Sequence, residues 1–228
     1  MSDLTFQKIF WLFLLGSVLG VFVEGFWCLF RYGKWETHTV AMWGPFNIVY
    51  GIGVPMFYLG SILVAGAHWL RRFAAHALIG SLVEYLCGIV IRIGVQMKAW
   101  DYSDHTMNIR GLISPKMTLV WGFAGLGFNL FLYSPLRGLL SLVTGAFWDF
   151  VCVLLTVFMI INLSLTAACI IRWSNRHRGK SAANRLTKWI DEVYPDSKMA
   201  RKFFYWSFIE PERTTQIDPS NSWNEEYL

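Results

Sequence analysis

The stretch IFWLFLLGSVLGVFVEGFWCLF, residues 9–30, carries a single charged side chain, Glu24. A helix of about 20 apolar residues spans the hydrocarbon core of a bilayer. The run is too long for the apolar part of a secretory signal peptide, and it is followed by no small-residue cleavage site. We therefore expect residues 5–30 to form a membrane-spanning helix.

The composition extends this interpretation to most of the chain. Of the 228 residues, 55% are hydrophobic and only 15% are charged, against about 25% in an average soluble domain. The sequence predicts an all-α integral membrane bundle of about five helices in residues 1–173. A basic tail, residues 174–228, follows with one or two short amphipathic helices. The further spans are expected at residues 43–67, 73–97, 116–133 and 140–172.

The placement of Lys and Arg predicts the orientation in the membrane. Basic residues cluster in the 17 or so positions after the last span, and such clusters mark the cytoplasmic side. With five spans, the cytoplasmic segments would hold 15 Lys and Arg residues and the outer segments four. The C-terminus is therefore expected in the cytoplasm. The net charge of +5 follows from this pattern, and no nucleic-acid-binding motif accompanies it.

Small residues suggest two local features. Gly16 and Gly20 form a small-xxx-small pair, which lets another helix approach closely. The stretch WGPFNIVYGIGVP, residues 43–55, is open to two interpretations. It is either an unwound segment that lines a cavity or a helix kinked at proline.

Ionisable groups inside the predicted spans are the first candidates for function. Glu24, Glu84 and Arg92 lie within apolar runs, where a charge is costly and by default marks a functional site. The structural alternative is a buried ion pair, for example between Glu84 and Arg92. For Asp149, in the last span, a structural role is the preferred interpretation.

The loop WDYSDHTMNIRG, residues 100–111, supplies the second group of candidates. On the predicted orientation it lies on the cytoplasmic side, as do the start of the second span and one half of the first. These parts could form one polar cavity for a small polar solute or an amphiphile headgroup; the alternative is a hydrogen-bonded turn between helices. The candidate ligand-binding residues are Glu24, Asn47, Tyr50, Glu84, Arg92, Trp100, Asp101, Tyr102, Ser103, Asn108 and Arg110.

Several other sites are not expected. Gly179, Lys180 and Ser181 resemble the end of a phosphate-binding loop, but position 174 is Ser and no strand is predicted before it. The four cysteines lie within or at the ends of apolar runs, and the histidines lack ligand spacing. We expect no metal, no cofactor and no catalytic residues.

Taken together, these motifs resemble a family of bacterial inner-membrane proteins labelled "Putative ABC-transporter type IV". The resemblance implies a permease subunit in the inner membrane, with a separate ATPase subunit or self-association. Asn47 stands where that family usually has Cys or Pro, and Arg92 where an acidic residue is common. The motifs are GVFVE at 20–24, WGP at 43–45, YGIG at 50–53, EYL at 84–86, WDYS at 100–103, Asn108 and RG at 110–111, with WID at 189–191 and YPD at 194–196 in the tail.

Three functions stay open at this point. The first is a transport or binding protein in the bilayer. The second is a non-transporting scaffold or sensor that acts through its tail, where Ser181 would cap one helix and residues 203–208 would expose aromatic side chains. The third is a membrane enzyme acting on a lipid-linked substrate.

Overall fold

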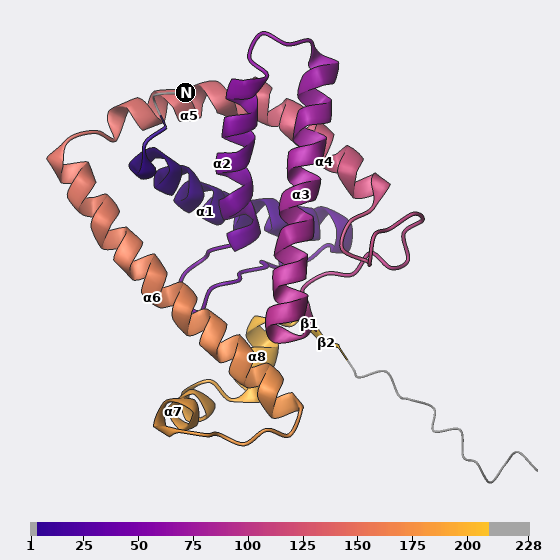
Figure 1. The fold of residues 1–228 in the computed structure, drawn as a ribbon, viewed down its shortest axis with the longest axis vertical. Coiled ribbons are helices and arrows are strands. Elements are labelled where there is room, and N and C mark those ends of the chain that lie inside the picture. The colour runs from indigo at the N-terminus through magenta and orange to yellow at the C-terminus, as the bar shows by residue number, and fades with distance from the viewer. Residues whose placement is uncertain (1–3, 210–228) are drawn as a thin grey trace, which may run out of the picture.

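The computed structural model describes residues 4–209 as an almost entirely helical chain (Figure 1). The predicted all-α class is confirmed. The one sheet in this part of the chain pairs two antiparallel strands of two residues each. The elements are α1 (Phe6–Tyr32), α2 (Ile48–Leu63), α3 (Trp69–Val95), β1 (Met97–Lys98), α4 (Pro115–Gly127), the π-helix η1 (Phe128–Leu132), α5 (Tyr133–Leu142), α6 (Ala146–His177), α7 (Arg185–Val193), α8 (Asp196–Lys202) and β2 (Ser207–Phe208).

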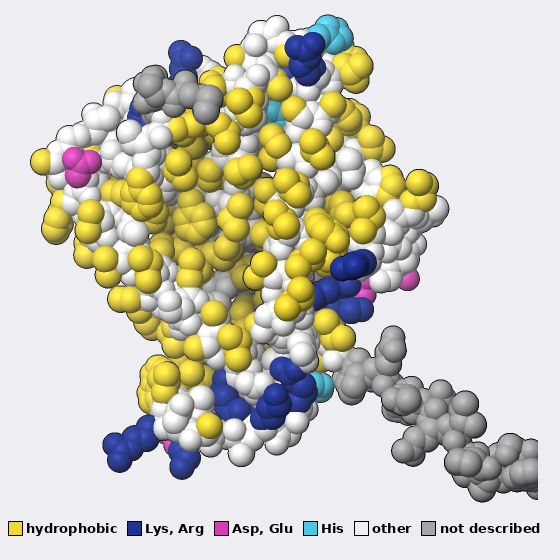
Figure 2. Space-filling model, in the orientation of Figure 1, with side chains coloured by type: hydrophobic (Ala, Val, Ile, Leu, Met, Phe, Trp, Pro, Cys, Tyr) yellow, Lys and Arg dark blue, Asp and Glu magenta, His cyan; other side chains and the backbone are white. Residues whose placement is uncertain are grey.

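Four continuous helical segments are long and apolar enough to cross a membrane, namely α1, α3, α4–η1–α5 and α6. Helix α2 is apolar but has 16 residues, about 24 Å at 1.5 Å per residue. The five predicted spans thus correspond to four long helices and one shorter one. Hydrophobic side chains cover the middle of the face in Figure 2, and most Lys and Arg side chains lie toward its edges.

Two helices begin later than the sequence predicted. The segment before α2 is unwound, Gly44 has a φ of 75°, and the Asn47 side chain accepts a hydrogen bond from the N–H of Val49 to start the helix. Helix α6 begins only after Gly145, so Asp149 lies exposed in its first turn. A carboxylate is stabilised there by the helix dipole, and Asp149 thus lies in the first turn of the last candidate span and not deep inside it.

Close packing between α1 and α2 confirms the expectation for the small-residue pair. A Cβ added to Gly16 would lie 2.6 Å from the Tyr50 carbonyl oxygen, and one added to Gly20 would lie 2.4 Å from the Tyr50 Cβ. Helix α3 packs against both α2 and α4. In Figure 1, α2 and α3 run side by side as an antiparallel pair.

The described part of the tail folds back onto the end of α6. Arg172 donates two hydrogen bonds to Asp191, of 2.8 and 2.7 Å, and Arg176 binds both Asp191 and Asp196. The first tail helix starts at Arg185 with Asn184 as its cap, not after Ser181. The pairing of β2 with β1 then holds the chain beside the end of α3.

This pairing corrects the expected exposure of the tail aromatics. Phe203 and Trp206 are buried, at 0% and 8% exposure, because the chain after α8 turns inward onto α6. Phe204 is exposed as expected.

Candidate functional site: two carboxylates beside an apolar cavity

Glu84 is buried on α3 and is hydrogen-bonded by two aromatic side chains. The Tyr102 hydroxyl donates to Oε1 at 2.7 Å, and the Trp121 indole N–H donates to Oε2 at 2.7 Å. Burial and the adjacent Glu84 charge raise the pKa of Tyr102, which keeps its hydroxyl a donor. The alternative ion pair between Glu84 and Arg92 is absent from the described contacts.

Glu24 on α1 has a similar arrangement with one titratable partner. The Tyr50 hydroxyl donates to Oε1 at 2.9 Å, and His38 Nδ1 lies 3.1 Å from Oε2. The His38 ring also lies against Tyr205, with 4.2 Å between ring centroids. The tail therefore reaches the surroundings of Glu24.

The two carboxylates belong to one cluster. The ring of Tyr50 meets the ring of Trp121 edge-on, with centroids 6.2 Å apart, so the donor to Glu24 contacts the donor to Glu84. We name this group the carboxylate cluster. It consists of Glu24, His38, Tyr50, Glu84, Tyr102 and Trp121, drawn from α1, α2, α3, α4 and the two long loops.

Polar side chains of the loop at 98–114 mainly hold the loop together. Burial would raise the pKa of Asp101, but hydrogen bonds from Lys98 and Ser103 outweigh it and lower the pKa to about 2. Asn108 donates to the carbonyls of Ser103 and His105 and accepts from the Gly111 N–H. This is the hydrogen-bonded turn of the structural alternative, and it positions Tyr102 against Glu84.

The remaining candidates surround this loop and the start of α2. Arg92 donates to the Arg110 carbonyl, and its Nη2 lies 3.8 Å from Asp101 Oδ1. The Arg110 side chain is exposed and makes no hydrogen bond or ion pair with residues 4–209. Trp100 donates to the Leu112 carbonyl at 3.0 Å, which closes the base of the loop. Asn47, which caps α2, also donates to the His38 carbonyl at 3.0 Å.

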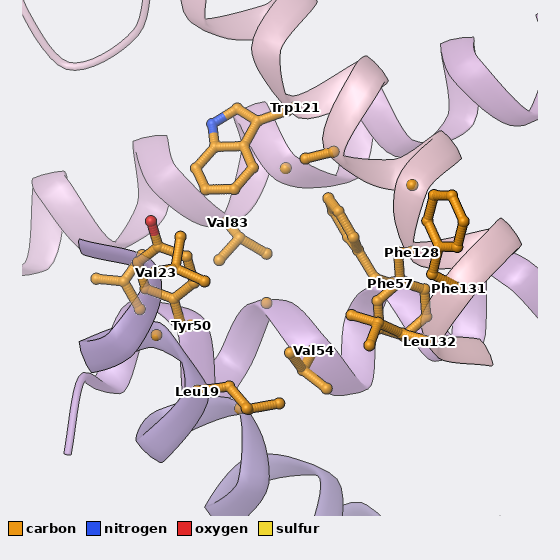
Figure 3. A pocket seen from close by; sticks show the side chains of 17 residues that line it. Leu19, Val23, Tyr50, Val54, Phe57, Val83, Trp121, Phe128, Phe131 and Leu132 are labelled. Carbon is orange, nitrogen blue, oxygen red and sulfur yellow. The ribbon is translucent and has the colours of Figure 1, made fainter. Parts of the chain in front are cut away.

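An apolar cavity of about 330 Å³ lies next to the carboxylate cluster (Figure 3). Tyr50 and Trp121 form one side of it, and η1 forms the opposite side. The expected single polar cavity is thus divided: the rings of Tyr50 and Trp121 line the apolar space, and their O–H and N–H groups bind the carboxylates. The other lining residues are Gly16, Leu19, Gly20, Val23, Val49, Gly53, Val54, Phe57, Gly80, Val83, Ala124, Gly127, Phe128, Phe131 and Leu132.

Sequence reasoning missed two members of the cluster, His38 and Trp121. An indole N–H inside an apolar span needs an acceptor, so Trp121 in the predicted span at 116–133 and Glu84 in the span at 73–97 were candidate partners. The partners are 37 residues apart, however, and only the packing of α3 on α4 brings them together. His38 lies in a polar connector without any spacing motif. Among residues 4–209, no group of three His, Cys, Asp or Glu side chains could hold a metal.

An almost entirely helical chain with four long apolar helices and a buried carboxylate, Glu84, is typical of a multi-pass membrane protein. The chain belongs to the family described as "Putative ABC-transporter type IV", whose family model matches residues 11–167. The matched region contains the whole carboxylate cluster and ends before the tail. Comparisons with curated proteins and with solved structures give no match.

Proposed function

We propose that the chain is a membrane subunit of an ABC-type transport system and binds a zwitterionic amphiphile headgroup at the carboxylate cluster. The observation that supports this proposal is that two carboxylates, Glu24 and Glu84, lie in the same cluster. Within residues 4–209 neither carboxylate has a Lys or Arg partner. Glu24 Oε1 and both oxygens of Glu84 each accept one hydrogen bond and keep further acceptor capacity, and His38 lies beside Glu24 Oε2. An incoming ammonium group would therefore find two carboxylates that have no Lys or Arg partner within the described chain.

The anionic part of the headgroup would meet Arg110. Its side chain is exposed, and the next residue, Gly111, accepts a hydrogen bond of 2.8 Å from the N–H of Tyr102 in the cluster. A guanidinium offers a planar fork of donors, which suits a phosphate. The positive-inside rule supports a cytoplasmic position for this loop and for the tail in the inner membrane.

A separate subunit would hydrolyse ATP. In the described chain, Gly179 and Lys180 follow helix α6 and lie in a turn, whereas a phosphate-binding loop joins a strand to a helix. The alternative of a scaffold that acts through its tail has less support, because Phe203 and Trp206 are packed against the protein itself and not exposed to a partner. The enzyme alternative has less support, because residues 4–209 contain no group of three His, Cys, Asp or Glu side chains that could hold a metal.

Thermal melting of the protein in maltoside micelles tests headgroup binding. The compounds are a phosphocholine, a sulfate and a maltoside with the same alkyl chain. Only the phosphocholine should raise the melting temperature, by roughly 5–10 °C at 100 times its Kd. Glu24→Gln and Glu84→Gln should each reduce the shift. Asp104→Asn, which removes an exposed charge from the same loop, should keep it; equal shifts for all compounds would refute the headgroup site.

A further inference from the structure

The mouth of the apolar cavity opens at a surface that the membrane would cover. Leu19 and Val23 on α1 are 40% and 52% exposed, and Phe131 and Leu132 at the end of η1 are 74% and 41% exposed. All four line the cavity and belong to membrane-spanning segments. The opening therefore faces the hydrocarbon of the bilayer from the side.

Two glycines leave the cavity unfilled. A Cβ atom added to Gly53 or to Gly127 would meet no other atom within 4 Å. The lining glycines Gly16 and Gly20 differ, since α2 already occupies the space beside them. The π-helix follows Gly127 directly and turns Phe128 and Phe131 toward the cavity (Figure 3).

The chemistry of the lining selects the occupant. An apolar cavity offers water no hydrogen-bond partners, and a polar solute would lose its hydration without compensation. A volume of 330 Å³ falls at the lower end of small-molecule sites, which hold about 300–1,000 Å³. The polar end of the space is closed by Tyr50 and Trp121, which hold Glu24 and Glu84 on their far side.

We propose that this cavity binds one alkyl chain of a membrane amphiphile, which slides in from the bilayer between α1 and η1. We call this cavity the alkyl-chain site, or chain site. It extends the proposed function by giving the amphiphile's apolar part a binding site, and it rests on that function only for the position of the headgroup. A chain lying against Tyr50 and Trp121 would end beside the carboxylate cluster.

Photolabelling in phospholipid vesicles tests the chain site with a long n-alkane that carries a terminal diazirine and has no headgroup. Labels should concentrate in residues 16–23, 49–57 and 127–132. Gly53→Leu or Gly127→Leu should reduce these labels about tenfold, the effect of displacing roughly two buried methylenes. Labelling of the exposed α6 residues Leu154 and Val157 should not change.

Gly94→Leu is the matched control, because Gly94 is also helical and also has open space beside it, yet lies outside the cavity. It should label like the native protein. Cavity labelling no denser than that of α6, and unchanged by both cavity variants, would overturn the proposal. Melting curves show which variants are folded. One folded cavity variant, Gly53→Leu or Gly127→Leu, is enough for the test.

Because the alkane has no headgroup, the two proposals can fail separately. Alkane labelling that depends on Gly53 and Gly127, without a melting shift from phosphocholine, would support the chain site and refute the headgroup site. A phosphocholine shift that depends on Glu84, without cavity labelling, would do the reverse.

Discussion

Tyr50, Tyr102 and Trp121 show how single residues accommodate carboxylates in an apolar bundle. Each side chain carries one polar hydrogen on a large apolar ring, so it packs in a core and still donates a hydrogen bond. Glu84 receives two such donors and Glu24 receives one together with His38. The two carboxylates are thereby held by aromatic hydrogen-bond donors and, among residues 4–209, not by Lys or Arg.

Replacing Glu84 tests this hydrogen bonding. Glu84→Leu should lower the free energy of unfolding by about 1–3 kcal/mol, because the N–H of the half-buried Trp121 and the hydroxyl of Tyr102 lose their acceptor. Glu84→Gln should cost less, since its amide oxygen can accept from Trp121 while its NH₂ group donates to the Tyr102 oxygen. Thermal melting of both variants in the same detergent makes the comparison; equal losses would contradict the assigned bonds.

The sequence was sufficient to single out Glu24 and Glu84, because a carboxylate inside an apolar run is conspicuous. It did not distinguish the carboxylates of the cluster from polar groups that hold a loop together. Asp101, Ser103 and Asn108 are as polar as any binding residue, yet their hydrogen-bond partners are within the same loop. Which partner a side chain meets depends on tertiary packing, and no spacing rule encodes it.

At the level of the elements, helix contacts made through glycine place the cavity walls. Gly125 of α4 lies against His76 of α3, and a Cβ added there would be 2.0 Å from the His76 Cβ. Asn129 in η1 lies 3.2 Å from His76 Nε2 and donates to the Gly125 carbonyl. This contact holds α3, α4 and η1 in register, so η1 faces the cavity.

Gly125→Ala should therefore destabilise the protein by about 1–3 kcal/mol, as overpacking does. Gly94→Ala has open space and should be neutral or slightly stabilising, because Ala favours a helix over Gly by about 0.5–1 kcal/mol. Chemical denaturation in mixed micelles compares the two substitutions. A Gly125→Ala variant as stable as Gly94→Ala would show that α3 and α4 are further apart.

The salt bridges of α6 with α7 and α8 make the tail a folded element. Asp191→Asn should weaken the ion pair with Arg172 and lower the free energy of unfolding by about 1–3 kcal/mol. The connection at residues 179–184 should then become accessible to protease. Glu192→Gln removes the same charge from the next residue, which makes no ion pair within the described chain, and should have little effect. Limited proteolysis reads out both variants, and equal cleavage would contradict a docked tail.

The same contact predicts a dependence on pH. Hydrogen bonds from Arg172 and Arg176 lower the pKa of Asp191 below its usual value. A lowered carboxyl pKa stabilises the folded protein above the unfolded pKa of about 3.9, and this contribution is lost as the pH falls through the folded value. The difference in melting temperature between the native protein and Asp191→Asn should be constant above about pH 5 and should shrink as the pH falls below about 4. A gap that persists at lower pH would contradict the assignment.

Element boundaries were predictable only where composition changes sharply. The start of α1 follows from its apolar run, but Gly145 and Asn47 set the starts of α6 and α2 through backbone conformation and capping. The π-helix η1 was not predicted from the sequence. The inward turn of Phe203 and Trp206 depends on the β1–β2 pairing, which joins segments more than 100 residues apart.

At the scale of the whole molecule, several helix ends and the long loops gather at one end of the bundle. The C-terminal ends of α1, α3 and α6 and the N-terminal ends of α2 and α4 lie on the side that carries the two long loops and the tail (Figure 1). The carboxylate cluster lies toward this end, and the apolar cavity lies deeper among the helices. An amphiphile has the same order of polar and apolar parts, which supports the proposed transport of such a molecule.

The most direct measurement is ATP-driven movement of a fluorescent phosphocholine amphiphile in inside-out vesicles prepared from the cells that make this protein. Dithionite quenching reports how much of the label is accessible from outside. ATP should change the accessible fraction with the native chain, and not with the chain deleted or with Glu24→Gln and Glu84→Gln combined. An ATP response that is the same in all three vesicle preparations would contradict the account.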